Sequence, residues 1–258
     1  MFLAVDVGNT QTVIGVLSGR RVLQQWRLSS GRERPRDEFA ILLRGLLAPT
    51  DYRAGDFEGA AMSSVVPPVA KALQSALEDL VGTRVLVVGP GIRTGMAIKI
   101  DNPREVGADR VVNSVAAREL YGAPSVVVDF GTATTFDVVD GRGDYVGGAI
   151  APGLEVSMEA LVSETAALRR VDLAPPRSVV GKSTVEAIQS GLLYGYASLV
   201  DGMLGRILEE YGGSAEETAP VVATGGIAPV IVPHCRLVST VDETLTLDGL
   251  RLIWERNR

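Results

Sequence analysis

Two short segments of the chain combine a carboxylate, a glycine and hydroxyl side chains within a few residues. Residues 6–12 read Asp-Val-Gly-Asn-Thr-Gln-Thr, and residues 129–135 read Asp-Phe-Gly-Thr-Ala-Thr-Thr. Glycine has no Cβ, so backbone N–H groups can approach an anion closely, and hydroxyls can donate hydrogen bonds to its oxygens. The carboxylate cannot bind a phosphate directly and would act through a metal ion or a water. Two such turns predict two clamps on one polyphosphate.

A single Asp-x-Gly turn is more often an ordinary hairpin turn, because aspartate and glycine favour turns in any protein. In this chain the turn occurs twice. Each copy follows an apolar run, at residues 2–5 and 125–128, and leads into a second one. The repetition between apolar strands, with threonine in both copies, favours a functional site over two unrelated turns.

The order of the predicted elements is repeated as well. Apolar patterns predict strands at 2–7, 11–17 and 22–28, a helix at 37–47, a strand at 59–65, a helix at 67–80 and a strand at 85–88. A helix is predicted to run from Pro103 to about Leu120. In the second half they predict strands at 125–129, 134–139 and 145–151, helices at 153–163 and 183–211, a strand at 221–223, a short helix from Gly226 and a last helix at 245–256. The sequence therefore predicts an α/β protein of two βββαβα lobes, residues 1–102 and 103–258, with a cleft between them.

Composition excludes several classes of protein. The chain has 258 residues and a formal net charge of -6, which argues against a general nucleic-acid surface. Every apolar run is too short to span a bilayer, and the N-terminus shows no basic region or cleavage site of a signal peptide. The single cysteine, Cys235, fits a reducing compartment, and with His234 beside it and no second histidine or cysteine it makes no transition-metal site. We therefore expect a cytoplasmic protein that binds neither membrane nor nucleic acid.

Six motifs, in their order along the chain, resemble those of type III pantothenate kinases, which belong to the superfamily of actin-like ATPases, sugar kinases and Hsp70. The resemblance covers nearly the whole chain. The motifs are Asp-Val-Gly-Asn-Thr at 6–10, Gly-Ala-Asp-Arg at 107–110, Asp-Phe-Gly-Thr-Ala-Thr at 129–134, Gly-Gly-Ala-Ile-Ala-Pro-Gly at 147–153, Val-Gly-Lys-Ser-Thr at 180–184 and Ala-Thr-Gly-Gly at 223–226. Each motif is weak alone, and the six together are specific.

The resemblance implies lobes of the actin-like ATPase (ribonuclease H-like) type and ATP-dependent phosphorylation of pantothenate, the first step of coenzyme A synthesis. It implies Mg²⁺, with Asp6 acting on it indirectly, and a monovalent cation, K⁺ or NH₄⁺, at Asp129. The implied contacts to ATP and its phosphates are Asp6, Val7, Gly8, Asn9, Thr10, Gln11, Thr12, Val13, Thr132 and Gly225. The implied contacts to pantothenate are Gly107, Ala108, Asp109, Arg110 and Thr184, together with the position of Ile100.

Asp109 and Arg110 are expected in the helix that follows Pro103, where a salt-bridged surface face is the ordinary interpretation. Phosphoryl transfer, however, needs a base near the attacking hydroxyl and positive charge near anionic groups. By resemblance Asp109 is the proton acceptor, and Arg110 could pair with the pantothenate carboxylate. Ile100 departs from the family, which often has tyrosine at this position, so a hydroxyl contact to the substrate would be lost.

Thr184 matches a pantothenate-binding threonine that can reach the site from a neighbouring subunit, so the resemblance implies a homodimer with shared active sites. A threonine at a helix start can also cap its own helix. The helical region after it has an apolar face that fits either the core or a subunit interface, and the resemblance favours an interface for part of it. This face consists of Ile188, Leu192, Leu193, Tyr196 and Leu199.

Two other functions fit parts of the sequence. A regulatory ATP-binding protein of the same superfamily would keep both phosphate turns but could dispense with the base at Asp109. A kinase for another small alcohol, such as a sugar, would usually be much longer and lacks the Gly-Ala-Asp-Arg match. The sequence alone does not give kinetic constants, feedback by coenzyme A or the oligomeric state.

Overall fold

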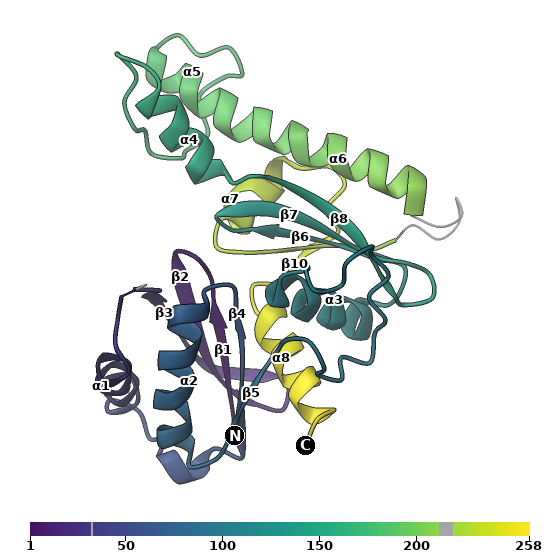
Figure 1. Cartoon of the computed structure of the whole chain (residues 1–258). Helices are drawn as coiled ribbons and strands as arrows, with labels where there is room; N and C mark the ends of the chain where they lie inside the picture. Colours follow the sequence, from purple (N-terminus) through teal and green to yellow (C-terminus); the bar gives the residue numbers. More distant parts are fainter. Residues whose placement is uncertain (32, 212–218) are drawn as a thin grey trace. The chain divides into compact units, whose positions relative to one another are not determined.

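The computed structural model describes residues 1–31, 33–211 and 219–258, which divide into two compact units (Figure 1). Unit 1 comprises Met1–Ala116 and Thr244–Arg258, and unit 2 comprises Ala117–Glu243. This division differs from the predicted lobes 1–102 and 103–258, because the start of the central helix and the C-terminal segment both pack with the first sheet. The predicted cleft between the lobes stays a prediction.

Unit 1 is built on a sheet that, in the described residues, has five strands in the order β3-β2-β1-β4-β5. The pairs β1–β2 and β2–β3 are antiparallel, and β1–β4 and β4–β5 are parallel. The strands are β1 (Phe2–Val7), β2 (Gln11–Ser18), β3 (Arg21–Ser29), β4 (Gly59–Ser64) and β5 (Val85–Val87). The helices of this unit are α1 (Arg36–Leu47), α2 (Pro67–Val81), the first part of α3 (Ala108–Tyr121) and α8 (Leu245–Glu255), with a 3₁₀ turn at Ala54–Asp56.

Strand alternation divides the side chains of unit 1 between two faces of the sheet. Leu3, Val5 and Val7 of β1 belong to a buried cluster that also contains Phe39 of α1 and Leu73 of α2. The intervening positions of β1, among them that of Asp6, therefore lie on the opposite face. Helix α8 covers that face, as Figure 1 shows for the side of the sheet away from α2.

Helix α8 packs closely on the sheet and on α3. A Cβ at Gly59 of β4 would lie 2.5 Å from the ring of Trp254, so only glycine leaves room for this helix. Thr246 of α8 donates a hydrogen bond to the side chain of Asn113 on α3, at 2.7 Å. The C-terminal end is also fixed, because the Asn257 amide accepts from the Arg93 N–H at 3.1 Å and donates to the Arg93 carbonyl at 2.8 Å.

Unit 2 has the same strand arrangement. Its described strands form a five-stranded sheet in the order β10-β9-β6-β7-β8, with β6–β7 and β7–β8 antiparallel and β6–β9 and β9–β10 parallel. The strands are β6 (Ser125–Phe130), β7 (Ala133–Val139), β8 (Tyr145–Pro152), β9 (Val221–Thr224) and β10 (Thr240–Val241). The helices are α4 (Leu154–Ser163), α5 (Thr184–Ser190), α6 (Tyr196–Tyr211) and α7 (Ala228–Ile231), with a 3₁₀ turn at Val232–His234. The predicted duplication of an α/β unit is confirmed.

The central helix begins later than predicted. Residues 102–105 form a turn instead of helix, in which the Glu105 N–H donates to the Asn102 carbonyl at 3.0 Å and the Asn102 amide donates to the Glu105 carboxylate at 2.6 Å. The Gly107 carbonyl then accepts from the Val111 N–H at 3.2 Å. The Gly-Ala-Asp-Arg motif therefore lies in the first turn of α3.

Two further details were not predicted. The expected continuous helix at 183–211 is interrupted by a π-helical segment, Gly191–Gly195, which is bounded by glycines and separates α5 from α6. Strand β10 has two residues, too few for an alternating pattern. Among the described residues, no helix is both long enough and apolar enough to cross a bilayer.

Candidate active site

The first Asp-x-Gly turn connects β1 to β2 and is held in place by hydrogen bonds from a serine. The Gly8 N–H donates to the Gln11 carbonyl at 2.9 Å. Ser30, just after β3, donates its hydroxyl to the Gly8 carbonyl at 2.6 Å and its N–H to the Thr10 carbonyl at 2.9 Å. The buried Thr12 hydroxyl lies 3.2 Å from that of Ser30. Among the predicted phosphate contacts, Asn9, Thr10 and Gln11 are exposed, whereas the Thr12 hydroxyl points inward and supports the turn.

Asp6 lies at the end of β1, on the face that α8 covers. The Ser63 hydroxyl of β4 donates to Asp6 Oδ1 at 2.6 Å. Burial raises the pKa of the Asp6 carboxyl from 3.8 to about 7; the Ser63 hydrogen bond opposes this shift, and the negative charge of Asp109 adds to it. A cation near this carboxyl would favour its ionised form and lower its pKa.

Asp109 is the second carboxylate of the group. It lies in the first turn of α3, where the Arg110 N–H donates to its Oδ1 at 2.9 Å. Burial raises the pKa of the Asp109 carboxyl, and the hydrogen bond and charge of Arg110 oppose the shift. A Cβ at Gly107 would collide with the Asp109 carboxylate, so glycine at this position makes room for the acid. The structure thus brings Asp6 and Asp109 within electrostatic reach inside unit 1.

The other predicted contacts of unit 1 are partly accounted for. Ala108 is the first residue of α3, and Arg110 is half-buried next to Asp109. Val7 is buried in the core beneath the turn, so only its backbone could face a ligand. Ile100 is half-buried in the segment between β5 and α3.

The second turn, in unit 2, also begins at a glycine whose N–H donates across it, but it is one residue shorter than the first, since Phe130 lies opposite Thr134 whereas Val7 lies opposite Thr12. The Gly131 N–H donates to the Ala133 carbonyl at 3.1 Å, and Thr132 is exposed. The Thr132 carbonyl accepts from the N–H of Gly153, the N-cap of α4, at 3.1 Å. The glycine that ends the 147–153 motif therefore has a structural role, because it ties the start of α4 to this turn.

Asp129 and Gly225 meet beside the second turn. Asp129 of β6 lies opposite Thr224 of β9 in the parallel register, and Gly225 follows directly with φ +96°. A Cβ at Gly225 would lie 2.7 Å from Asp129 Oδ1 and 2.5 Å from the Phe130 carbonyl oxygen. Glycine is required at 225 both for this backbone conformation and for the space that the carboxylate takes.

Thr184 is exposed at the first position of α5, but it is not the cap of the helix. The cap is Ser183, whose hydroxyl accepts from the Glu186 N–H at 3.2 Å. The capping interpretation of Thr184 is therefore wrong. Within the part of the chain that the structure describes, no hydrogen bond or ion pair joins Thr184 to the second turn.

The apolar face after Thr184 lies largely inside unit 2. Leu193 and Tyr196 belong to the buried cluster on the sheet, and Ile188 and Leu192 pack on Met158 of α4. The expectation that part of this face forms a subunit interface is corrected for these four side chains, since their own unit covers them. Only Leu199 of the predicted set is exposed, at 38%.

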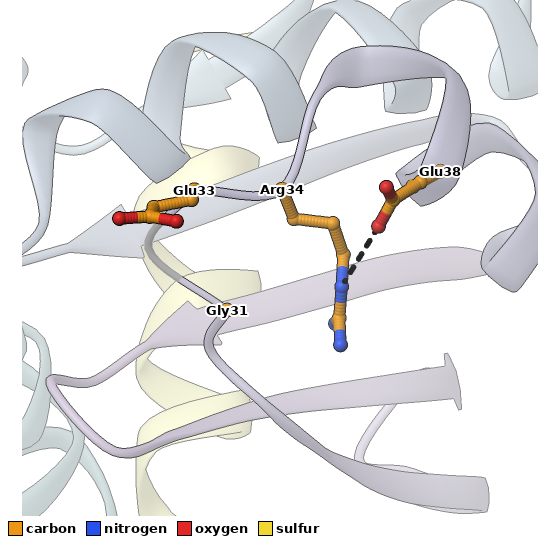
Figure 2. Close-up of a pocket in the computed structure, with 4 residues that line it drawn as sticks. All are labelled: Gly31, Glu33, Arg34 and Glu38. Carbon is orange, nitrogen blue, oxygen red and sulfur yellow. Dashed lines mark ion pairs between the residues drawn. The ribbon is translucent and has the colours of Figure 1, made fainter.

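Two other groups do not belong to the site. His234 packs edge-on against Tyr194 with ring centroids 5.4 Å apart, and burial raises the pKa of the Cys235 thiol to about 11. They form a packed loop pair, as expected. A surface hollow of about 550 Å³ is lined by Gly31, Glu33, Arg34 and Glu38, none of them a predicted site residue. Figure 2 shows the ion pair between two of these residues, Arg34 and Glu38, with 3.6 Å between Nε and Oε2.

Metal binding by protein groups alone finds no support in the described residues, which contain no cluster of three or more histidine, cysteine, aspartate or glutamate side chains suited to an ion. Mg²⁺ in kinases is normally held by one or two carboxylates together with waters and substrate phosphates. Asp6 and Asp109 fit that pattern, because burial disfavours the ionised form of both carboxyl groups and a divalent cation nearby would favour it.

Comparison with known proteins agrees with the geometry. A family model described as type III pantothenate kinase matches residues 2–206. A type III pantothenate kinase from Streptomyces griseus is 48% identical over 262 residues, covering 100% of this chain and 98% of the relative. Another, from Pelobacter propionicus, is 46% identical over 258 residues and covers 100% of both chains.

Solved structures show the same fold at low identity. Component A of the (R)-2-hydroxyglutaryl-CoA dehydratase of Acidaminococcus fermentans has a TM-score of 0.57 at 14% identity, with 100% of this chain and 99% of that chain covered. The activator of the 2-hydroxyisocaproyl-CoA dehydratase of Clostridium difficile, solved with ADPNP, has a TM-score of 0.54 at 11% identity, covering 99% of this chain and 95% of that chain. These likenesses support the duplicated α/β fold.

The raised pKa of Asp6 predicts a pH-dependent stability difference. Between about pH 4 and about pH 7 the folded protein retains a proton on Asp6 that the unfolded chain has lost, so this group makes stability fall as pH rises through that window. Asp6→Asn should therefore increase the free energy of unfolding at pH 8, by roughly 1–4 kcal/mol at about 1.4 kcal/mol per pKa unit, and by little at pH 4.

Urea unfolding without divalent metal at pH 4, 6 and 8 measures this difference. Asp51→Asn, which changes an exposed carboxyl of unit 1, is the control and should show no such trend. A gain for Asp6→Asn that is the same at all three pH values would contradict the assignment.

Proposed function

The chain belongs to the type III pantothenate kinase family, and we propose roles in phosphoryl transfer for the residues of its two Asp-x-Gly turns and of the first turn of α3. As a member of this family the protein phosphorylates pantothenate with ATP, giving 4'-phosphopantothenate in the first step of coenzyme A biosynthesis. The observation that supports the residue assignment is that two separate motifs each supply a carboxyl group of unit 1 whose pKa is raised by burial, and that the charge of Asp109 acts on Asp6.

Asp109 is the general base. A base works best when its pKa lies near the working pH, and burial moves the pKa of Asp109 upward from the ordinary carboxyl value. Gly107 leaves the space in which the carboxylate sits, and the Arg110 N–H holds one of its oxygens. The free oxygen accepts the proton of the pantothenate hydroxyl as that hydroxyl attacks the γ-phosphate.

Asp6 would help to hold Mg²⁺ on the nucleotide phosphates through a water. When bound, the ion neutralises charge that develops on the transferring phosphoryl group. The exposed residues Asn9, Thr10 and Gln11 bind phosphate oxygens, and the Ser30 and Thr12 hydroxyls keep their turn in shape.

Unit 2 supplies the remaining nucleotide and ion contacts. Thr132, exposed in the second Asp-x-Gly turn, binds phosphate, and the Gly225 backbone receives the adenosine. Asp129 binds K⁺ or NH₄⁺. An ion there is supported by the position of the half-buried Asp129 carboxylate beside Gly225. Glycine has no Cβ that would cover the carboxylate on this side.

Pantothenate is recognised through its charge and its hydroxyl. Arg110 pairs with the pantothenate carboxylate, and Ile100 contributes an apolar surface where the family often has tyrosine. Thr184 completes the pocket of a partner subunit in a homodimer. Exposed aliphatic side chains beside it support a partner at this place: Val179 is 68% exposed, Val180 79% and Val185 50%. A cytoplasmic location follows from the use of ATP and fits the single cysteine.

Pantothenate should be phosphorylated in the presence of Mg²⁺ and ATP, and other small alcohols, sugars included, should not. The rate should be higher in K⁺ or NH₄⁺ than in Na⁺, which is the preference that the family resemblance implies for an ion at Asp129. A coupled assay of ADP release measures both properties. Asp129→Asn should abolish the preference for K⁺, and full activity of the native protein in buffer with Na⁺ alone would remove the proposed cation role.

Asp109→Asn should lower kcat by roughly 10²–10⁴-fold, because the amide cannot accept the proton. The variant keeps a side chain of the same shape beside Gly107, so the fold should survive, as circular dichroism can verify. Asp101→Asn, in the exposed segment before α3, is the matched control. Near-normal turnover by a folded Asp109→Asn protein would exclude Asp109 as the base.

Subunit exchange tests the shared site. Asp109→Asn and Thr184→Val proteins, each nearly inactive, are mixed under conditions that exchange subunits. If Thr184 serves the partner's pocket, a mixed dimer has one pocket with both lesions and one with neither, so activity should partly return. No recovery after exchange has been demonstrated, or full activity in a monomer, would show that Thr184 does not serve a partner.

A further inference from the structure

Ser63 is fully buried on β4, and its hydroxyl makes the one described protein hydrogen bond to the Asp6 carboxyl. The oxygen–oxygen distance of 2.6 Å lies in the range of hydrogen bonds from a hydroxyl to an ionised carboxylate. The parallel register of β1 with β4 sets the two residues directly opposite each other. The bond holds Oδ1 and leaves Oδ2 without a described protein donor.

Unit 2 repeats this arrangement. Asp129 is the last residue but one of β6, as Asp6 is of β1, and the residue opposite it on the neighbouring parallel strand β9 is Thr224. Thr224 is 3% exposed, so a buried hydroxyl residue occupies the corresponding position in both sheets. Strand order and pairing direction are also the same in the two units. A hydroxyl residue opposite the turn carboxylate is thus a feature of the repeated unit.

We propose that Ser63 is a positioning residue for phosphoryl transfer: its hydroxyl fixes one oxygen of Asp6 so that the other faces a water of the metal–nucleotide complex. The proposal rests on the role assigned to Asp6 above. Without the bond the carboxyl could rotate about its χ2 torsion, which is broad for aspartate. Groups that orient a metal's immediate partners commonly change metal affinity or activity by 10–100-fold when they are removed.

Three variants separate this role from simple packing. Ser63→Ala removes the donor. Ser63→Thr keeps the hydroxyl, and Thr224 shows that threonine occupies the matching position of the second sheet. Ser64→Ala, the same change one residue along β4, is the control, because strand alternation puts Ser64 on the opposite face. Urea unfolding is measured for each protein to compare their stabilities.

The readout is the affinity of each protein for ATP with Mn²⁺ as the probe metal, measured by water proton relaxation without pantothenate. Ser63→Ala should weaken this affinity roughly 10-fold or more. Ser63→Thr should lie near the native value, and Ser64→Ala should match it. In assays with Mg²⁺, Ser63→Ala should raise the metal concentration for half-maximal rate and leave the KM for pantothenate nearly unchanged.

A double-mutant cycle with Asp6→Ala shows whether Ser63 acts through Asp6. Removing the Ser63 hydroxyl should have no further effect on Mn²⁺–ATP binding once the Asp6 carboxyl is gone. An equal loss with and without Asp6, or native affinity in Ser63→Ala, overturns the proposal. Because binding is measured without pantothenate, a failure of the native protein to phosphorylate pantothenate would count against the proposed function and not against Ser63.

Discussion

The removal of the Asp6 and Asp109 carboxyl groups from water is the constraint on which the site in unit 1 depends. Burial raises the pKa of both carboxyl groups, and the negative charge of Asp109 adds to the shift at Asp6. Each carboxyl group accepts one hydrogen bond, Asp6 from the Ser63 hydroxyl and Asp109 from the Arg110 N–H. Gly107 adds the space that lets the second acid approach. Burial of the two ionised carboxyl groups thus lowers the stability of the fold, and a bound cation would reduce this loss.

The duplication explains how one architecture serves two chemical ends. In both units aspartate is the last residue but one of the first strand, a glycine turn follows, and a parallel neighbour lies alongside. The neighbourhoods then diverge. Asp6 meets a carboxylate from a helix, whereas Asp129 meets the glycine backbone at 225. The repeated unit fixes where a charge is placed, and the segments packed around it decide what the charge can do.

Much of the fold could be read from local patterns, because alternating apolar residues determine strands and their faces. The start of α3 could not. Proline suits the first turn of a helix, which is why the sequence predicts a helix from Pro103. Hydrogen bonds between Asn102 and Glu105 form a turn there instead, and α3 begins only at Ala108. Periodicity also could not tell which surface covers the face that contains Leu193 and Tyr196, since a core and an interface need the same stripe.

In the site, the motif residues could be named from the sequence, but their supports could not. Ser30 and Ser63 have no distinctive sequence context, and their contacts to Gly8 and Asp6 depend on strand pairing between distant segments. The requirement for glycine at 107 likewise comes from the path of a side chain two residues away. Such supports become visible only when the register is known.

The return of α8 to the first sheet has a consequence for synthesis of the chain. Unit 1 is discontinuous in the sequence. Its strands are translated before unit 2, whereas α8, whose Trp254 packs on Gly59 and which covers one face of the sheet, is translated after unit 2. At 5–20 residues per second, the ribosome needs roughly 10 s to make the intervening residues of unit 2. During that interval the continuous unit can complete its own core while the earlier one stays half-covered. Unit 2 is therefore the first that can finish folding, although it is made second. Until α8 has been made, one face of the N-terminal sheet stays exposed and could be bound by chaperones.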